Sequence, residues 1–300
     1  MELRVIDFGR VSAIRSQSLW HAIAYGVSDG SPPTLSFMTP ESPYVSIGLH
    51  SDIGAVDLAA CERAGLPVYR RMVGGGPVYL DHDQLFFQIT VPSSTLPAKR
   101  SRAVRQLLAP AVEAFRNVGV DARLDETNEI VVGDQKVCGH AAGQIGGAVL
   151  VVGNLITGFD HDAAAAIAKT PNDVAARTFR RMLERYVTAV NADPARFVVE
   201  ATHAYTSSLQ GGQASLRARG GREPASLERL ETSDQGGARA REPRLQTELT
   251  PYEREKLEEL DRKLADPSFV QGEPRQQREP WRIKVKSGVF VYADAIEEAV

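Results

Sequence analysis

Three consecutive glycines after a short strand pattern constrain the fold of this chain more than any other feature. Residues 67–70 have the composition of a strand, and the glycines follow at residues 74–76. Glycine lets the backbone adopt positive φ and approach a ligand closely with its N–H groups exposed. With the arginine pair at residues 70–71, the segment predicts an anion-binding loop. A tight turn with two surface arginines is the alternative.

The first 206 residues alternate helical and strand patterns, separated by short turn clusters. This alternation predicts one mixed α/β, or α+β, domain with a central mixed β-sheet flanked by helices. We expect helices at residues 12–27, 58–64, 102–118, 162–169 and 173–190 and strands at residues 34–38, 44–47, 67–70, 85–91, 128–139 (a hairpin) and 146–153.

The composition changes at about residue 207. Residues 207–247 are rich in Gly, Arg, Glu, Ser and Gln and poor in large apolar side chains, so they can bury little surface to offset chain entropy. This predicts a flexible linker. Residues 248–300 follow as a charged helix, capped by Thr250, and a hairpin. This piece is too small to fold comfortably alone, so we expect a small accessory domain that docks on the main domain or closes over it.

The charge and the apolar content exclude several classes of function. A net charge of -3 over 300 residues gives no global reason to expect nucleic acid or a membrane surface as a partner. No apolar run approaches the roughly 20 residues of a transmembrane helix, and the N-terminus lacks a signal-peptide pattern, so we expect a cytoplasmic protein. The two cysteines, Cys61 and Cys138, make neither a disulfide framework nor a metal set.

Lys136 is the candidate for catalysis. It lies in the second strand of the predicted hairpin, just before the small residues 138–143, which leave room for a ligand. A lysine ammonium is a compact charge that can draw together a carboxylate and a phosphate. A solvated lysine beside a turn is the alternative, and a lone histidine such as His140 is more often structural than a ligand.

Taken together, these motifs resemble the lipoate-protein ligase family, within the biotin/lipoate A/B protein ligase superfamily. The resemblance covers about residues 1–190. It rests on the Arg-Arg-x-x-Gly-Gly-Gly-x-Val-x-x-Asp signature at residues 70–81, the strand ending in Ser46-x-Gly48, and the segment Lys136-x-x-Gly139-x-Ala141. It implies a class II aminoacyl-tRNA synthetase/biotin-protein ligase-like catalytic domain with an accessory domain.

The resemblance also implies a two-step reaction. Lipoate or a similar acyl acid attacks the α-phosphate of ATP, with Mg²⁺, to give an acyl-adenylate and pyrophosphate. A lysine ε-amine of a carrier protein then takes the acyl group. The implied carrier is the lipoyl domain of a 2-oxoacid dehydrogenase subunit, the glycine-cleavage H protein or another lipoate carrier.

Carried over by position, Lys136 matches the family's essential lysine. The residues expected to bind lipoate or its adenylate are Arg70, Gly74, Gly75, Gly76, Val78, Asn128, Gly139, His140 and Ala141. Neither the metal ligands nor a base for the incoming amine can be assigned from the sequence.

The chain departs from the family pattern at several positions of the site. Val73 stands where the family usually has Ser, Leu80 replaces a frequent His, Asp83 replaces Gly, and Asn154 ends a strand that is usually His-His-Gly-Thr. Two alternatives therefore stay open. One is an octanoyl or lipoyl transferase that uses a carrier thioester and a cysteine, for which Cys138 is the nearest candidate. The other is a lipoyl-binding homologue without catalysis.

Overall fold

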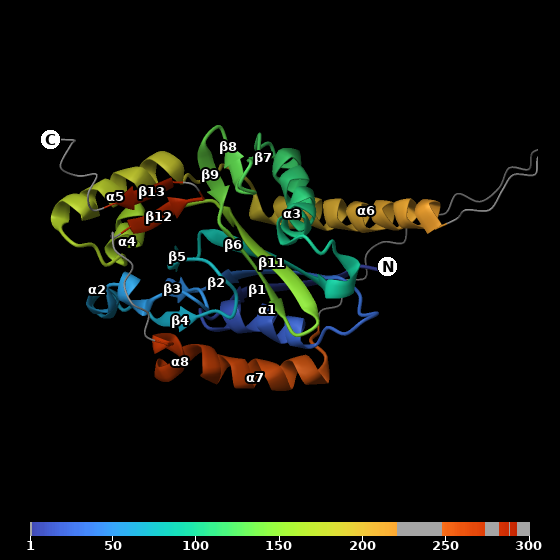
Figure 1. Ribbon diagram of the computed structural model, residues 1–300, viewed down its shortest axis with the longest axis horizontal. Helices are drawn as coiled ribbons and strands as arrows, with labels where there is room; N and C mark the ends of the chain where they lie inside the picture. The colour runs from blue at the N-terminus through green and yellow to red at the C-terminus, as the bar shows by residue number, and fades with distance from the viewer. Residues whose placement is uncertain (1, 221–247, 274–281, 288, 293–300) are drawn as a thin grey trace, which may run out of the picture.

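A five-stranded mixed sheet forms the centre of the molecule (Figure 1). The computed structural model describes residues 2–220, 248–273, 282–287 and 289–292. Within the sheet, the first two strands are parallel and the other neighbours are antiparallel. The strands, in spatial order, are β1 (Arg4–Val11), β2 (Thr34–Pro40), β6 (Gln84–Pro92), β11 (Ala148–Ile156) and β10 (His140–Ile145).

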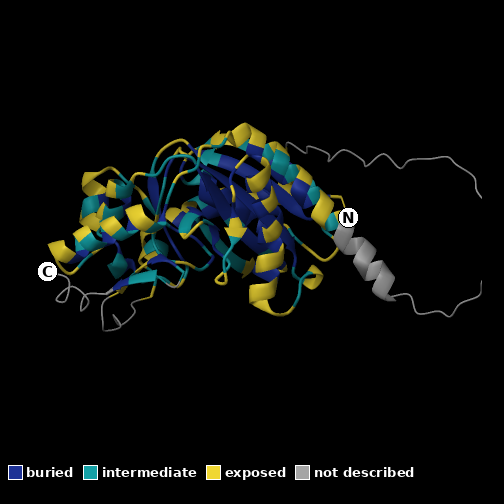
Figure 2. Ribbon diagram, turned by 90° about the horizontal axis from the view of Figure 1, so that it is seen from above, coloured by how far each residue is buried: buried dark blue, intermediate teal, exposed yellow. Residues whose placement is uncertain are grey.

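Both faces of this sheet are covered, which explains why every residue of the central strand β6 is buried. On one face, α3 (Arg100–Asn117) and α6 (Pro194–Gly220) pack together, and Phe197 lies against Phe87 and Phe115 with ring centroids 5.7 and 5.0 Å apart. On the other face, α1 (Arg15–Tyr25) packs Trp20 in one cluster with Phe86. Figure 2 shows the buried residues gathered in this central layer.

Helix α6 corrects the predicted start of the linker. We expected a flexible segment from residue 207 and no helix here, but α6 runs from Pro194 to Gly220. Its first half carries Phe197, Ala201 and Tyr205 at helical spacing against α3, and the Tyr205 hydroxyl donates to the Leu107 carbonyl at 2.7 Å. These contacts with α3 stabilise the helix, although the local composition favours a flexible segment. The rest of the predicted linker, 221–247, lies outside the described residues.

No helix among the described residues is long and apolar enough to cross a membrane.

Three smaller sheets surround the central one. Their strands, in spatial order, are β4 (Val68–Arg70), β3 (Tyr44–Ile47) and β5 (Val78–Leu80); β7 (Arg123–Leu124), β8 (Ile130–Val132) and β9 (Gln135–Cys138); and β12 (Arg282–Lys286) with β13 (Val289–Tyr292). The short helices are α2 (Leu58–Arg63), α4 (His161–Ala166) and α5 (Asp173–Tyr186). The β8–β9 hairpin is the predicted one, with Gly133 at its turn (φ 59°). Strands β1, β5, β7 and β10 were not predicted.

The C-terminal helix and hairpin contact different parts of the main domain. Helix α7 (Pro251–Ala265) begins with the predicted Thr250 cap and packs on α1, and α8 (Pro267–Gln271) packs on β4. The β12–β13 hairpin packs instead on α5. Figure 1 shows α7 and α8 along one edge of the molecule and the hairpin beside α5, away from them. The segment therefore docks on the main domain, as expected, but at two places.

Candidate active site

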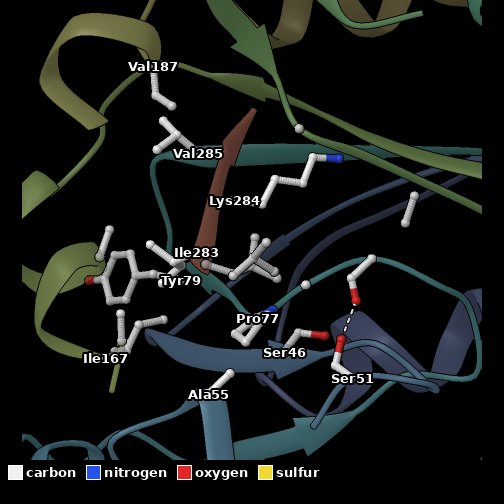
Figure 3. Close-up of a pocket in the computed structure, with 18 of the residues that line it drawn as sticks. Ser46, Ser51, Ala55, Pro77, Tyr79, Ile167, Val187, Ile283, Lys284 and Val285 are labelled. Carbon is white, nitrogen blue, oxygen red and sulfur yellow. Dashed lines mark hydrogen bonds between the residues drawn. The ribbon is translucent and has the colours of Figure 1, made fainter. Parts of the chain in front are cut away.

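A cavity of about 1380 Å³ lies between the glycine loop and the β12–β13 hairpin. Figure 3 shows its two sides: Lys284 and its neighbours on β12 lie across from Pro77 and Ser46. The cavity brings together most of the predicted site, namely Gly75, Gly76, Val78, Lys136, Gly139, His140 and Ala141. The predicted residues Arg70, Gly74 and Asn128 are not among those that line it.

The glycine loop has the backbone that the sequence predicts. Gly75 has φ +107°, and a Cβ at this position would lie 2.4 Å from a guanidinium nitrogen of Arg71. A Cβ at Gly48 would lie 2.0 Å from the Gly75 carbonyl oxygen, so the loop and the end of β3 pack backbone to backbone. Side chains are therefore excluded from both positions, and the loop can approach a ligand closely.

Arg71, and not the predicted Arg70, is the member of the arginine pair that lines the cavity. It is buried, and it donates to the Ser46 and Gly76 carbonyls at 2.9 Å each and to the Gly74 carbonyl at 3.1 Å. Burial lowers the pKa of Arg71 to about 10, which leaves it a cation at neutral pH. Arg71 thus holds the glycine loop in shape and places positive charge at the cavity wall.

Arg70, which the sequence predicted in the ligand site, does not line this cavity and bonds to backbone carbonyls of the fold. It is 2% exposed and donates to the Gly48 and Ser51 carbonyls at 2.8 Å each and to the Val270 carbonyl at 2.7 Å. These bonds tie the end of β4 to helix α8. Adjacent residues of an extended chain point in opposite directions, so only one of the two arginines can face the cavity.

Lys136 and His140 flank a buried carboxylate that was not predicted as a site residue. Glu129, 3% exposed, has its Oε2 3.7 Å from the Lys136 Nζ and 3.5 Å from the His140 Nδ1. Burial raises the pKa of Glu129, but the His140 ring and the Lys136 ammonium lower it by more, so the carboxyl lies well below its ordinary range. Only its place in the Asn-Glu-Ile segment of the family pattern could have pointed to it.

The C-terminal hairpin contributes to this cluster. The Ser287 backbone N–H donates to the Glu129 Oε1 at 3.1 Å, and the Lys286 ammonium lies 5.3 Å from the Tyr186 ring centre. Lys284 lines the cavity, and burial lowers its pKa. The hairpin therefore closes one side of the cavity and contacts the carboxylate that pairs with Lys136.

Asn128 lies in the turn that leads into this cluster. It has φ 65°, and its side chain accepts from Arg105 at 3.1 Å and donates to the Ser101 carbonyl at 3.3 Å. These contacts are with α3 and not with the cavity. Asparagine tolerates this backbone conformation better than most residues, so Asn128 shapes the turn that presents Glu129.

Two of the departures from the family pattern have structural roles. The Asn154 Oδ1 accepts from the Gly139 N–H at 2.6 Å, and its amide nitrogen donates to the Gln84 Oε1 at 2.7 Å, so Asn154 fixes the backbone beside Lys136. Val73 is buried, and a Cβ at Gly143 would lie 2.6 Å from it. Val73 therefore packs against the bare backbone of β10.

Neither cysteine faces the cavity. Cys138 is fully buried, its thiol donates to the Gly139 carbonyl at 3.3 Å, and burial raises its pKa to about 12. Cys61 is also buried, and burial raises its pKa too. Because the thiolate is the nucleophilic form, neither residue has the environment of a reactive cysteine.

Most of the apolar part of the cavity wall comes from two separate hydrophobic clusters. Trp20 and Phe86 belong to the cluster under α1, whereas Phe179, Val187 and Val285 belong to the cluster between α5 and the hairpin. The cavity can therefore hold a ligand with two apolar parts beside an anionic group. Among the described residues, no group of three or more His, Cys, Asp or Glu side chains is placed to hold a metal ion.

Residues 16–194 match the family described as the lipoyl protein ligase A/B catalytic domain. The chain belongs to this family. An octanoyltransferase LipM from Geobacillus kaustophilus (strain HTA426) is 26% identical over 238 residues, which are 70% of this chain and 85% of that protein. Lipoate-protein ligase A subunit 1 of Thermoplasma acidophilum is 25% identical over 174 residues, which are 55% of this chain and 64% of that protein.

Solved structures of lipoate-protein ligases have the same fold. A bipartite lipoate protein ligase from Thermoplasma acidophilum, solved with its E2 lipoyl domain, superposes with a TM-score of 0.73 at 22% identity, covering 92% of this chain and 99% of that one. A lipoate-protein ligase A bound with ATP gives 0.69 at 21% identity, covering 91% and 99%. The predicted α+β class, with a mixed sheet flanked by helices, is confirmed.

Proposed function

We propose that this lipoyl ligase family member is an ATP-dependent ligase. It would activate lipoate, or a similar acyl acid, as an acyl-adenylate and transfer the acyl group to a lysine of a lipoyl carrier domain. The observation that carries the proposal is the burial of both cysteines away from a cavity lined by Lys136 and Arg71. Transfer through an acyl-enzyme needs an accessible thiolate, whereas adenylation needs fixed cations.

The cavity suits the charges of adenylation. A carboxylate and a triphosphate repel each other, and Lys136 can neutralise both while the Glu129 carboxylate keeps its ammonium in place. Arg71 and the backbone of Gly75 and Gly76 line the same wall. The two apolar clusters could accept the acyl chain and the adenine ring. Mg²⁺ would enter with ATP and be held mainly by phosphate oxygens and water, as is usual for this ion.

The acceptor proposed is a lipoyl domain of a 2-oxoacid dehydrogenase subunit, the glycine-cleavage H protein or a similar carrier. The Thermoplasma acidophilum ligase of the same fold was solved with its E2 lipoyl domain, which supports a carrier of this kind. In this proposal the substrate lysine reaches the cavity from outside, and no residue of the chain becomes acylated.

A second candidate is an octanoyltransferase that takes the acyl group from a carrier thioester without ATP. It is favoured by relatives named octanoyltransferase LipM, such as the one from Kyrpidia tusciae, which is 28% identical over 259 residues. With both thiols buried, such a reaction would have to be a direct attack of the acceptor lysine on the thioester.

Mass spectrometry of a lipoyl domain separates these functions. The domain is incubated with the protein and either lipoate, ATP and Mg²⁺ or an octanoyl carrier thioester without ATP. The proposal predicts a mass increase with ATP and lipoate or octanoate, retained in Cys138→Ala. Modification from the thioester alone would refute it, whether Cys138→Ala loses that activity (a cysteine acyl-enzyme) or retains it (direct attack on the thioester). Binding without turnover and a neutral Lys136→Ala variant would instead indicate a homologue without catalysis.

A further inference from the structure

The acceptor amine must lose a proton before it can attack, and the proposed function leaves that proton unassigned. A lysine ε-amine has an ordinary pKa of about 10.4, so near neutral pH it is almost entirely the ammonium, which has no lone pair. A group within the cavity that accepts one proton would raise the fraction of reactive amine at the point of attack.

We propose that His140 is this general base and that Glu129 is the residue that positions it. The inference rests on the proposed function. His140 is the first residue of β10 and lines the cavity beside Lys136, with 13% of its side chain exposed. Its Nδ1 is buried and faces the Glu129 Oε2 at 3.5 Å, and neither atom has a hydrogen-bond partner among the described residues.

The buried carboxylate selects one form of the ring. An ionised carboxylate beside Nδ1 favours the tautomer with the proton on Nδ1, which leaves the lone pair on Nε2 at the opposite edge of the ring. Because Nδ1 is buried, the exposed part of the His140 side chain belongs to the rest of the ring. The 3.5 Å separation is long for a hydrogen bond, and catalytic contacts of this kind often tighten only when substrate binds.

His21 shows what a structural histidine looks like in the same chain. It is fully buried, its Nδ1 lies against the Gln17 carbonyl, and its Nε2 accepts from the Met72 N–H at 2.9 Å. Burial lowers its pKa to about 3, so the ring stays neutral. Both ring nitrogens of His21 are used inside the protein, whereas His140 lies at the cavity and is paired with a carboxylate.

The other charged groups around His140 are poor candidates for the same role. Lys136 on β9 is needed for the carbonyl and phosphate, and the Lys284 Nζ on β12 donates to the Ser287 hydroxyl at 2.9 Å within its own hairpin. Glu129, just before β8, pairs with Lys136 and is held as a carboxylate. His50, an exposed residue after β3, also lines the cavity and is the rival that an experiment has to exclude.

Transfer of the acyl group removes two protons from the substrate ammonium. The His140 Nε2 takes one proton from the substrate ammonium, and the freed lone pair forms the C–N bond to the acyl carbon. The C–O bond to the phosphate breaks, and its electron pair leaves on AMP. The second N–H proton passes to solvent as the amide forms. Lys136 takes no part in this proton transfer and lies next to the leaving phosphate.

Measuring the two half-reactions separately tests the proposal with His140→Gln. Lipoate-dependent exchange of pyrophosphate into ATP reports adenylation, and single-turnover transfer from the preformed adenylate to a lipoyl domain reports the second step. We expect transfer at pH 7 to be slowed on the order of 100-fold, the usual size of general-base catalysis, and pyrophosphate exchange to be slowed far less. The deficit should shrink as the pH rises, because the amine then loses its proton unaided.

The rate of reaction with hydroxylamine distinguishes a general base from a residue that only shapes the pocket. This small amine is already unprotonated at neutral pH, so its reaction with the bound adenylate should be within a few-fold of wild type in His140→Gln. His203→Gln, on the exposed surface of α6, is the control that should leave both steps unchanged. Glu129→Gln should also slow transfer to the lipoyl domain, and it should slow the reaction of the adenylate with hydroxylamine by a smaller factor.

Three results would overturn the assignment. Equal loss of exchange and transfer in His140→Gln would mean that the residue shapes the site and does not move a proton. If His140→Gln slowed the reaction with hydroxylamine as much as it slowed transfer to the lipoyl domain, the residue would again only shape the site. Loss of transfer in His50→Gln, with normal transfer in His140→Gln, would make His50 the base. Absence of exchange in the wild-type protein would instead refute the proposed adenylation itself, and the base role with it.

Discussion

At the scale of single residues, neighbouring side chains of the same type have different structural roles. Arg70 supports the fold, and Arg71 supports the glycine loop and charges the cavity. The sequence could predict that the glycine loop and Lys136 share a site, because both are local motifs, and they line one cavity. That this cavity binds an anion stays a prediction. The sequence could not predict which arginine faces the cavity or that Glu129 lies under Lys136, because those depend on how distant strands pack.

The two arginines should respond differently to removal of the charge. Arg70→Met leaves several buried carbonyls without a donor, so its free energy of unfolding should fall by about 2–5 kcal/mol. The folded fraction should still carry out pyrophosphate exchange. Arg71→Met should lower exchange at least 10-fold, since it removes a cation from the cavity. Urea denaturation and exchange assays on both variants check this, and a reversed pattern would contradict the assignment.

The Glu129 carboxylate should make stability depend on acid pH. Its pKa is lowered in the folded protein from an ordinary 4.5, so its contribution is present above 4.5 and is lost as the pH falls toward the folded-state value. Glu129→Gln should therefore lower the free energy of unfolding at pH 7, by about 1–3 kcal/mol, and by less as the pH falls below 4.5. Urea denaturation at several pH values measures it, and a loss that is the same at every pH would contradict the pairing.

At the scale of elements, packing decides what local composition cannot. Helix α6 continues into a segment whose composition suggests a linker, because its first half is anchored on α3. The helix and hairpin near the C-terminus were predicted as elements, and the Thr250 cap was predicted correctly. Their separate docking sites could not be predicted, because each depends on the surface of another element. The boundaries of an accessory domain stay a prediction.

The hairpin should affect adenylation through one backbone hydrogen bond. Ser287→Pro removes the N–H that donates to Glu129, whereas Ser287→Ala keeps it. Hydrogen bonds to charged groups contribute about 1.5–3 kcal/mol, so we expect exchange to fall roughly 10-fold or more in the proline variant. The alanine variant should stay near wild type. Equal exchange rates in the two variants would show that the hairpin does not position Glu129.

At the scale of the whole molecule, the C-terminal helix and the N-terminal strand are joined by a buried ion pair. The Arg4 guanidinium lies 2.6 Å from the Glu253 carboxylate, and both side chains are almost fully buried. The same glutamate completes the capping box of α7. This pair connects the first strand of the central sheet to helix α7, which packs on α1, so it couples two segments far apart in the sequence.

Glu253→Ala should destabilise the whole fold, because it leaves the Arg4 charge buried without its partner. We expect the free energy of unfolding to fall by about 3–5 kcal/mol, the usual cost of breaking a buried pair from one side. Arg180→Ala removes an exposed pair with Asp162 and is the control, for which we expect no measurable change. Thermal and urea denaturation of both variants provide the measurement, and equal stability of the two would contradict the coupling.

Exchange of labelled pyrophosphate into ATP is the most direct test of the proposed ligase. It reports formation of the acyl-adenylate without any carrier domain. The wild-type protein and the Cys138→Ala variant should both catalyse exchange that depends on lipoate or octanoate, and Lys136→Met should reduce it at least 100-fold. No exchange by wild-type protein with any short acyl acid, together with acyl transfer from a carrier thioester, would contradict the account.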